Sequence, residues 1–260
     1  MIKKTALMAL SSILLPSTTL LSWHLSTLKL NRYKTYLENG TYDHQDWSKL
    51  KRKPLSRYDT FKRAFEEFEK MNGHIIVELG TTRSFVHGAL EGCNNSNPKY
   101  WTPDKPDRWD WGAGCFTRVV SECLEHVKPE IHTVDLEAAH INRCKLITQE
   151  FNHLISYHVT SSEAYLKHCR FQIDLLYLDT GDMTPIEPTA QLHLREAKIV
   201  VERDLIRTGG LILIDDVRNQ TPKKFGETSD YGKAKYSLPY FLENGFEMVL
   251  DEYQILLRKK

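Results

Sequence analysis

The sequence predicts an α/β protein whose doubly wound, mostly parallel sheet closes with an antiparallel hairpin. Two observations carry this prediction. From about Ile75 to the C-terminus, short apolar and β-branched runs alternate with segments of helical periodicity. Runs that are apolar on both faces are what parallel strands covered by helices require. The last two runs have no helical segment between them, so they are expected to form a terminal hairpin.

The expected elements follow in chain order. Residues 57–71 carry apolar side chains at three and four residue steps and stop at Asn72-Gly73, which predicts an amphipathic helix. Parallel strands are expected at residues 75–79, 131–136, 155–159, 173–178 and 211–217. Helices are expected between them at residues 116–126, 138–151, 162–169 and 188–206. The hairpin strands are expected at residues 246–252 and 254–258.

The chain divides into three predicted parts. Residues 1–22 are hydrophobic and contain Lys3 and Lys4 ahead of the apolar stretch, as in a secretory signal or an anchor. The length of this stretch is at the lower edge for a membrane-spanning helix. Residues 23–72 are expected to form a helical lead and linker, and residues 73–260 one large α/β domain.

Composition narrows the classes of partner. The 35 basic residues nearly balance the 34 acidic ones, so no long-range field favours nucleic acid. A small-molecule substrate fits better, and no nucleic-acid partner is expected. The five cysteines are odd in number and lack CxxC spacing, so they are expected to be reduced core residues rather than a disulfide or zinc framework.

Polar residues follow the apolar runs where each predicted strand ends. In an open α/β sheet, ligands bind beyond the carboxyl ends of the strands, so these residues are the informative ones. They are Glu78, Gly80 and Thr81 at the end of the first strand, Asp135 at the end of the second, Ser162 and Glu163 after the third, Asp179 after the fourth, and Asp215 and Asp216 at the end of the fifth.

This order resembles the class I S-adenosylmethionine-dependent methyltransferases, in which Glu-x-Gly follows the first strand and an acid ends the second. The resemblance covers residues 57–260 and implies a Rossmann-like sheet with N-terminal helices. It places Gly80 against the methionine part of S-adenosylmethionine, Asp135 on both ribose hydroxyls, and the turn at Ser162 and Glu163 near adenine. A carboxylate suits a ribose diol because it can accept both hydrogen bonds. An NAD-binding sheet also uses a carboxylate to bind a ribose diol.

The glycine loop departs from both families. The dinucleotide fingerprint GxGxxG is absent, and the methyltransferase loop does not continue directly after Gly80. Gly112 and Gly114 appear later, just before the helix that contains Thr117. This arrangement indicates one cofactor loop, including Glu78 and Thr81, that is split by an insertion over residues 85–109. The alternative is that the later glycines only turn a surface loop.

The insertion and the residues just after it are rich in aromatic side chains, among them Trp101, Trp109 and Trp111. A long aromatic loop beside a cofactor is typical of a lid or a substrate wall. A self-packed surface loop is the alternative.

The acids after the fourth and fifth strands look like the metal site of catechol-type O-methyltransferases. By that resemblance Asp179, Asp215 and Asp216 bind one divalent cation. Three converging carboxylates repel each other unless neutralised, and hard oxygen ligands suit Mg²⁺. The alternative is that Asp179 caps the following turn and Asp215 orders its own loop.

The catalytic lysine of the catechol-type enzymes has no counterpart after Asp179, where the chain reads Thr180-Gly181-Asp182-Met183. A general base must come from elsewhere, and Asp182 and His193 are the candidates beside Asp179 itself. Further along, residues 218–236 carry Lys233 among several lysines. They are expected to form a solvated basic loop over the site.

The resemblance implies O-methylation of a small molecule by S-adenosylmethionine, assisted by Mg²⁺. Two alternatives remain: an NAD- or nucleotide-sugar-binding Rossmann enzyme, and a non-catalytic Rossmann-like binding protein. Because S-adenosylmethionine is made in the cytosol, a cytoplasmic body is expected, with membrane contact through residues 1–22 as an open expectation.

Overall fold

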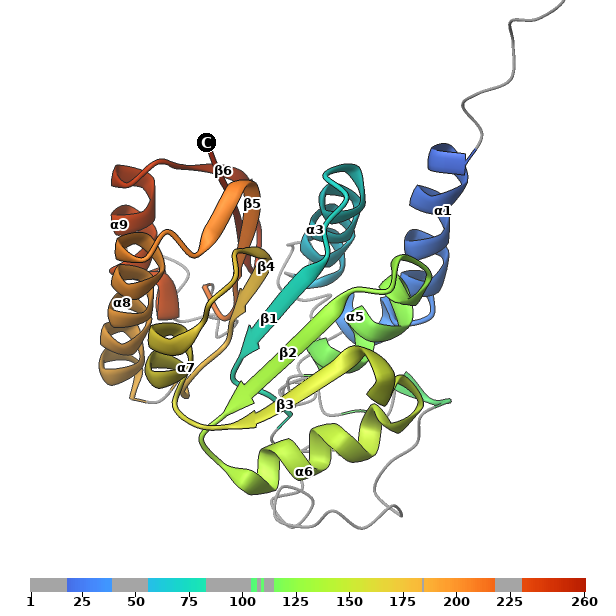
Figure 1. The fold of residues 1–260 in the computed structure, drawn as a ribbon, viewed down its shortest axis with the longest axis horizontal. Helices are drawn as coiled ribbons and strands as arrows, with labels where there is room; N and C mark the ends of the chain where they lie inside the picture. The colour runs from blue at the N-terminus through green and yellow to red at the C-terminus, as the bar shows by residue number, and fades with distance from the viewer. Residues whose placement is uncertain are drawn as a thin grey trace, which may run out of the picture.

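One seven-stranded sheet organises the protein in the order β3-β2-β1-β4-β5-β7-β6 (Figure 1). The computed structural model describes residues 18–38, 56–82, 104–106, 109, 115–183, 185–217 and 231–260. The parallel strands are β1 (Ile75–Leu79), β2 (Glu130–Asp135), β3 (Ile155–Val159), β4 (Ile173–Leu178) and β5 (Ile206–Ile214). The antiparallel strands are β6 (Phe246–Asp251) and β7 (Ile255–Lys259).

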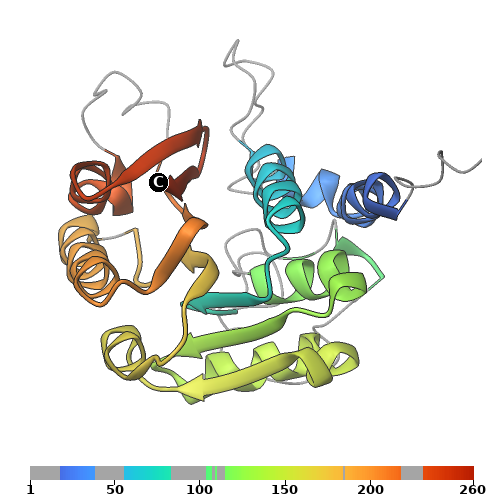
Figure 2. The same ribbon diagram turned by 45° about the horizontal axis from the view of Figure 1, so that its top comes forward.

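Helices cover both faces of the sheet, as Figure 1 and Figure 2 show. One face carries α3 (Tyr58–Lys70), α5 (Phe116–Leu124) and α6 (Ala138–Ile147), and the other carries α7 (Ser162–His168), α8 (Ile186–Glu202) and α9 (Ser237–Glu243). Outside the first layer, α1 (Thr18–Asn31) packs on α3 and α5 and is followed by α2 (Lys34–Glu38). The remaining elements are short 3-10 turns: η6 (Glu125–Val127), η7 (Gln149–Leu154) and η9 (Gly232–Ala234).

The apolar face of α3 anchors the sheet on one side. Phe61 and Phe65 of α3 pack near Phe116 of α5, whose ring stacks on Tyr177 of β4 at 4.1 Å between centroids. All four side chains are at most 2% exposed, and full burial of each large apolar side chain stabilises the fold by about 1.5–3 kcal/mol. This packing fixes the start of α3 over the carboxyl ends of β4 and β5.

The predicted fold class is confirmed, with differences at the ends of elements. β5 begins at Ile206 rather than residue 211, because Ile206 pairs with Ile173 across a register shift that accommodates the glycines between. α8 accordingly stops at Glu202. α9 was not predicted. Four cysteines are buried and free, as expected: Cys115, Cys123, Cys144 and Cys169.

The first part of the N-terminal lead, from α1 to α2, is docked on the rest of the protein through polar and aromatic contacts. Ser26 of α1 donates a 2.7 Å hydrogen bond to Glu69 of α3. Tyr33 and Tyr36 each lie 5.4 Å from the ring of Trp109, which is 1% exposed. At Trp109, therefore, the insertion packs against the lead. In the part of the chain that the structure describes, no helix combines the length and apolarity needed to cross a bilayer; residues 1–17 lie outside that part.

Candidate functional site

The turn after β1 and the acid at the end of β2 meet at the carboxyl edge of the sheet. The backbone N–H of Thr81 donates to Asp135 Oδ2 at 3.0 Å, and the N–H of Gly80 donates to the carbonyl of Val134 at 2.8 Å. Gly80 has φ +85°, and a Cβ there would lie 2.5 Å from the carbonyl oxygen of Asp179. Only glycine fits this position, so the β1 turn is held against the ends of both neighbouring strands.

The Asp135 side chain is kept ionised, and one of its oxygens is available to a ligand. Burial acts to raise its pKa, but hydrogen bonds from His140 and from the amides of Thr81 and Glu137 outweigh it and lower the pKa. Oδ1 accepts from the Glu137 amide at 2.8 Å and faces His140 Nδ1 at 3.1 Å, whereas Oδ2 accepts from Thr81. Since a carboxylate offers about four acceptor positions, Oδ2 can accept one more hydrogen bond, from a ligand hydroxyl.

Glu78 lies beneath this turn and joins it to the next helix. Its side chain is fully buried and accepts hydrogen bonds from Thr117, in the first turn of α5, and from Thr133 of β2 at 2.6 Å. Burial raises the pKa of Glu78 to about 8, against the effect of these two hydrogen bonds. Glu78 Oε1 has no hydrogen-bond partner among the described residues.

The structure describes only some of the other residues predicted to bind the cofactor. Gly112 and Gly114 lie outside the described residues, so the split-loop hypothesis stays a prediction. Ser162 is buried at the start of α7, and Glu163 is engaged by Arg195 of α8 at 3.1 Å. The cap of α7 is Ser161, whose hydroxyl accepts from the Ala164 amide.

The three acids of the predicted metal site do come together. Asp179, Asp215 and Asp216 each offer an oxygen, and these oxygens lie within 4.8 Å of one another. Two cations reach them. Lys233 Nζ lies 2.8 Å from Asp179 Oδ1 and 2.9 Å from Asp216 Oδ2. Arg57 contacts both oxygens of Asp215, with Nε at 3.0 Å and a terminal nitrogen at 2.6 Å.

Further side chains complete this acid cluster, defined as Asp179, Asp215 and Asp216. Gln254 donates to Asp215 at 2.9 Å and the Tyr253 hydroxyl donates to Asp216. Burial acts to raise the pKa of Asp216, but Lys233 and Arg57 outweigh it and hold that pKa below its usual range. The same burial raises the pKa of Asp179, against the charge of Lys233.

Lys233 corrects the expectation of a solvated basic loop at its position. Its side chain is only 3% exposed and belongs to the acid cluster. Sequence reasoning missed Arg57, Tyr253 and Gln254 because they are far from the acids in the chain, and no local motif marks them.

The two other candidates for the general base, His193 and Asp182, differ in their burial. His193 is fully buried, and its Nε2 lies 3.0 Å from the carbonyl oxygen of Thr180. Burial first, and the charge of Lys233 second, lower the pKa of His193 to about 3. This position favours a structural role over the predicted role as general base. Asp182 is exposed, and its carbonyl accepts from Thr189 at 2.7 Å.

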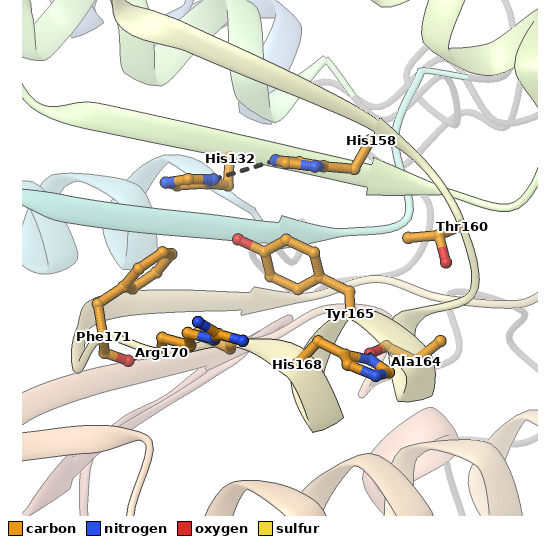
Figure 3. Close-up of a pocket in the computed structure, with 9 residues that line it drawn as sticks. His132, His158, Thr160, Ala164, Tyr165, His168, Arg170 and Phe171 are labelled. Atoms are coloured by element: carbon orange, nitrogen blue, oxygen red, sulfur yellow. Dashed lines mark hydrogen bonds between the residues drawn. The ribbon is translucent and has the colours of Figure 1, made fainter.

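A separate pocket of about 500 Å³ lies along the α7 face of β2 and β3 (Figure 3). His132 Nδ1 and His158 Nε2 are 3.1 Å apart, and the rings of Tyr165 and Phe171 lie beside them. Burial lowers the pKa of both histidines. At His132 the charge of Glu130 opposes this shift, whereas at His158 the charge of His132 adds to it. Sequence analysis missed this pocket because its histidines sit within strands, away from the strand ends.

No protein-family model matches the sequence, and no curated protein matches it either. Among solved structures, the SAH-bound methyltransferase PaMTH1 of Podospora anserina is similar over 96% of this chain and 100% of its own, with 14% identity and a TM-score of 0.52. The O-methyltransferase TomG of Streptomyces achromogenes, in complex with SAM, covers 89% of this chain and 88% of its own, with 11% identity and a TM-score of 0.43. The chain therefore has the Rossmann-like fold of the Podospora methyltransferase.

Proposed function

We propose that this chain is a class I S-adenosylmethionine-dependent methyltransferase that methylates an oxygen atom of a small molecule. The observation that carries the proposal is the 3.0 Å hydrogen bond from the Thr81 amide to Asp135. It brings the glycine turn and the acid to one point at the carboxyl edge, where open α/β sheets bind their ligands. The shared fold with an SAH-bound methyltransferase supports the same assignment.

The residues at this edge fit the cofactor. Asp135 keeps acceptor capacity at Oδ2 for a ribose hydroxyl, and Gly80 lets the β1 turn lie against the Asp179 backbone, where a side chain would clash. S-adenosylmethionine, when bound, supplies a methyl group activated by its sulfonium. The residues of this chain bind and orient the reactants, which in such transfers supplies much of the rate acceleration.

Asp179 is the residue proposed to receive the proton of the acceptor hydroxyl. Its backbone contacts Gly80 and its side chain is 13% exposed at the end of β4, so it lies beside the cofactor turn and is within reach of solvent. A base must be within hydrogen-bond reach of the proton it takes. Lys233 and Arg57 already contact all three acids, so the proposed reaction needs no Mg²⁺ at these residues.

Thermal unfolding with S-adenosylmethionine, S-adenosylhomocysteine or NAD tests the proposal. A ligand at about 100 times its Kd stabilises a protein by about 2.7 kcal/mol, so the first two compounds should raise Tm and NAD should not. Asp135→Ala should abolish the effect. Glu137→Ala is the matched control, because the Glu137 side chain is exposed and only its backbone amide contacts Asp135.

Three outcomes contradict the proposal. Stabilisation by NAD alone would favour a dinucleotide enzyme, and stabilisation by none of the three compounds would favour a binding protein of another kind. Unchanged affinity of Asp135→Ala for S-adenosylhomocysteine in calorimetry would refute the ribose contact.

A further inference from the structure

The acid cluster already holds its own counter-charges. Three carboxylates face two cations, and each carboxylate contacts at least one of them: Asp215 and Asp216 face Arg57, and Asp179 and Asp216 face Lys233. One negative charge remains if all five groups are ionised. The repulsion that would favour a divalent cation among bare carboxylates is therefore largely relieved within the chain.

A divalent cation would have to compete for the same oxygens. Mg²⁺ needs ligand oxygens at about 2.0–2.1 Å in octahedral geometry. Asp179 Oδ1 and Asp216 Oδ2 are the atoms that contact Lys233 Nζ at 2.8 Å and 2.9 Å, and both oxygens of Asp215 are engaged by Arg57. The ammonium thus stands between two of the three expected ligands, and the residues present do not fit the ion.

The backbone holds Lys233 in this place. The Lys233 amide donates to the carbonyl of Asp216 at 3.3 Å, and both Asp216, at φ +52°, and Gly232, at φ +49°, have left-handed backbone. A Cβ on Gly232 would lie 2.2 Å from the Asp216 carbonyl oxygen, so only glycine allows this approach. Because the Lys233 side chain is 3% exposed, it is a built part of the cluster and not a surface side chain that swings in.

We propose that Lys233 takes the place of the divalent cation in this fold, so that the acid cluster binds no metal ion and Lys233 acts as the positioning residue for Asp179. The role in positioning Asp179 rests on the proposed methyltransferase function. The exclusion of a divalent cation does not, because it concerns only the charges and distances within the cluster.

Titration of the full-length protein with Mn²⁺, followed by the electron paramagnetic resonance signal of the free ion, tests the proposal without any need for catalysis. The wild-type protein should bind no Mn²⁺ at the cluster up to about 1 mM. Lys233→Met keeps the length of the side chain but removes its charge, so it should gain one Mn²⁺ site at least about tenfold tighter than any in the wild-type protein. Combining it with Asp216→Asn should remove that site.

Lys235→Met is the matched control. Lys235 is 35% exposed and pairs with Glu187 instead of the cluster, so its removal should leave Mn²⁺ binding unchanged. Mn²⁺ should also raise the Tm of Lys233→Met but not of the wild-type protein, because an ion that binds only the native state stabilises it.

Two results would overturn the proposal. One is a wild-type Mn²⁺ site that Asp216→Asn abolishes, and this measurement decides even if Lys233→Met fails to fold. The other is a folded Lys233→Met protein that gains no site. Methyltransferase activity separates the two claims: an inactive wild-type protein that still excludes Mn²⁺ contradicts the proposed function alone, and activity lost in chelator contradicts the exclusion of metal.

Discussion

Replacing Arg57 by methionine should be among the most destabilising single changes outside the apolar core. The Arg57 side chain is 7% exposed, makes two hydrogen bonds to the fully buried Asp215 at 3.0 and 2.6 Å, and lies 3.5 Å from Asp216. Removing one partner of a buried ion pair costs about 3–5 kcal/mol, because the other charge stays buried. Total stabilities are about 5–15 kcal/mol, so this is a large share.

Urea unfolding at pH 7, followed by circular dichroism, measures the loss. Arg63→Met, in the helix α3 that Arg57 precedes, is the control, since Arg63 is 45% exposed and pairs with Glu67 at 3.1 Å. Exposed pairs contribute about 0–1 kcal/mol. Adding Asp215→Asn to Arg57→Met should recover about 1–2 kcal/mol, because it removes the uncompensated charge. A loss below about 1 kcal/mol, or no recovery in the double variant, would refute the reasoning.

Two further predictions follow. Gly80→Ala should cost about 2–4 kcal/mol, since it combines a positive φ with a Cβ 2.5 Å from the Asp179 carbonyl, whereas Gly209→Ala, at φ +78° with open space around it, should cost only about 1–2 kcal/mol. The pKa of His193 is lowered to about 3, so the unfolded chain binds a proton before the native state does. Unfolding free energy should therefore fall from about pH 6.5 toward pH 3, by about 2 kcal/mol at pH 5, and His193→Gln should lack this share.

Urea unfolding measures the free energy of unfolding for both predictions. Equal costs for the two glycine variants would mean that the contact with Asp179 adds nothing beyond backbone strain. For His193, wild type and His193→Gln are compared between pH 8 and pH 5, and parallel curves would show that His193 titrates alike in the native and unfolded states.

The strands could be predicted from sequence because each is a short run rich in apolar residues, and the central strands β1 and β4 are buried on both faces. β1, β3 and β4 begin and end at the predicted residues. α9 (Ser237–Glu243) escaped prediction because it contains Pro239, which is unfavourable inside a helix and therefore argues against one there. Tertiary packing rather than propensity stabilises helices of this length.

The candidate site was predictable only where strand ends supply its residues. Asp135, Asp179, Asp215 and Asp216 follow apolar runs, and the topology of parallel strands brings such ends together. The cations could not be found in this way. Arg57 lies 158 residues from Asp215 in the sequence. Lys233 stands among other lysines in a stretch of sequence rich in turn residues, which predicts a solvated loop, and only the structure shows that its side chain is buried.

Tyr33 and Tyr36 join the N-terminal lead to Trp109, just ahead of α5 in the chain. Trp109 precedes α5, whose first turn supplies Thr117 to the buried Glu78, and its ring is covered by Tyr33 and Tyr36. Thermodynamic coupling between two sites is reciprocal. A ligand that binds more tightly when the lead is docked on Trp109 would therefore stabilise that docking by the same factor, without touching the lead.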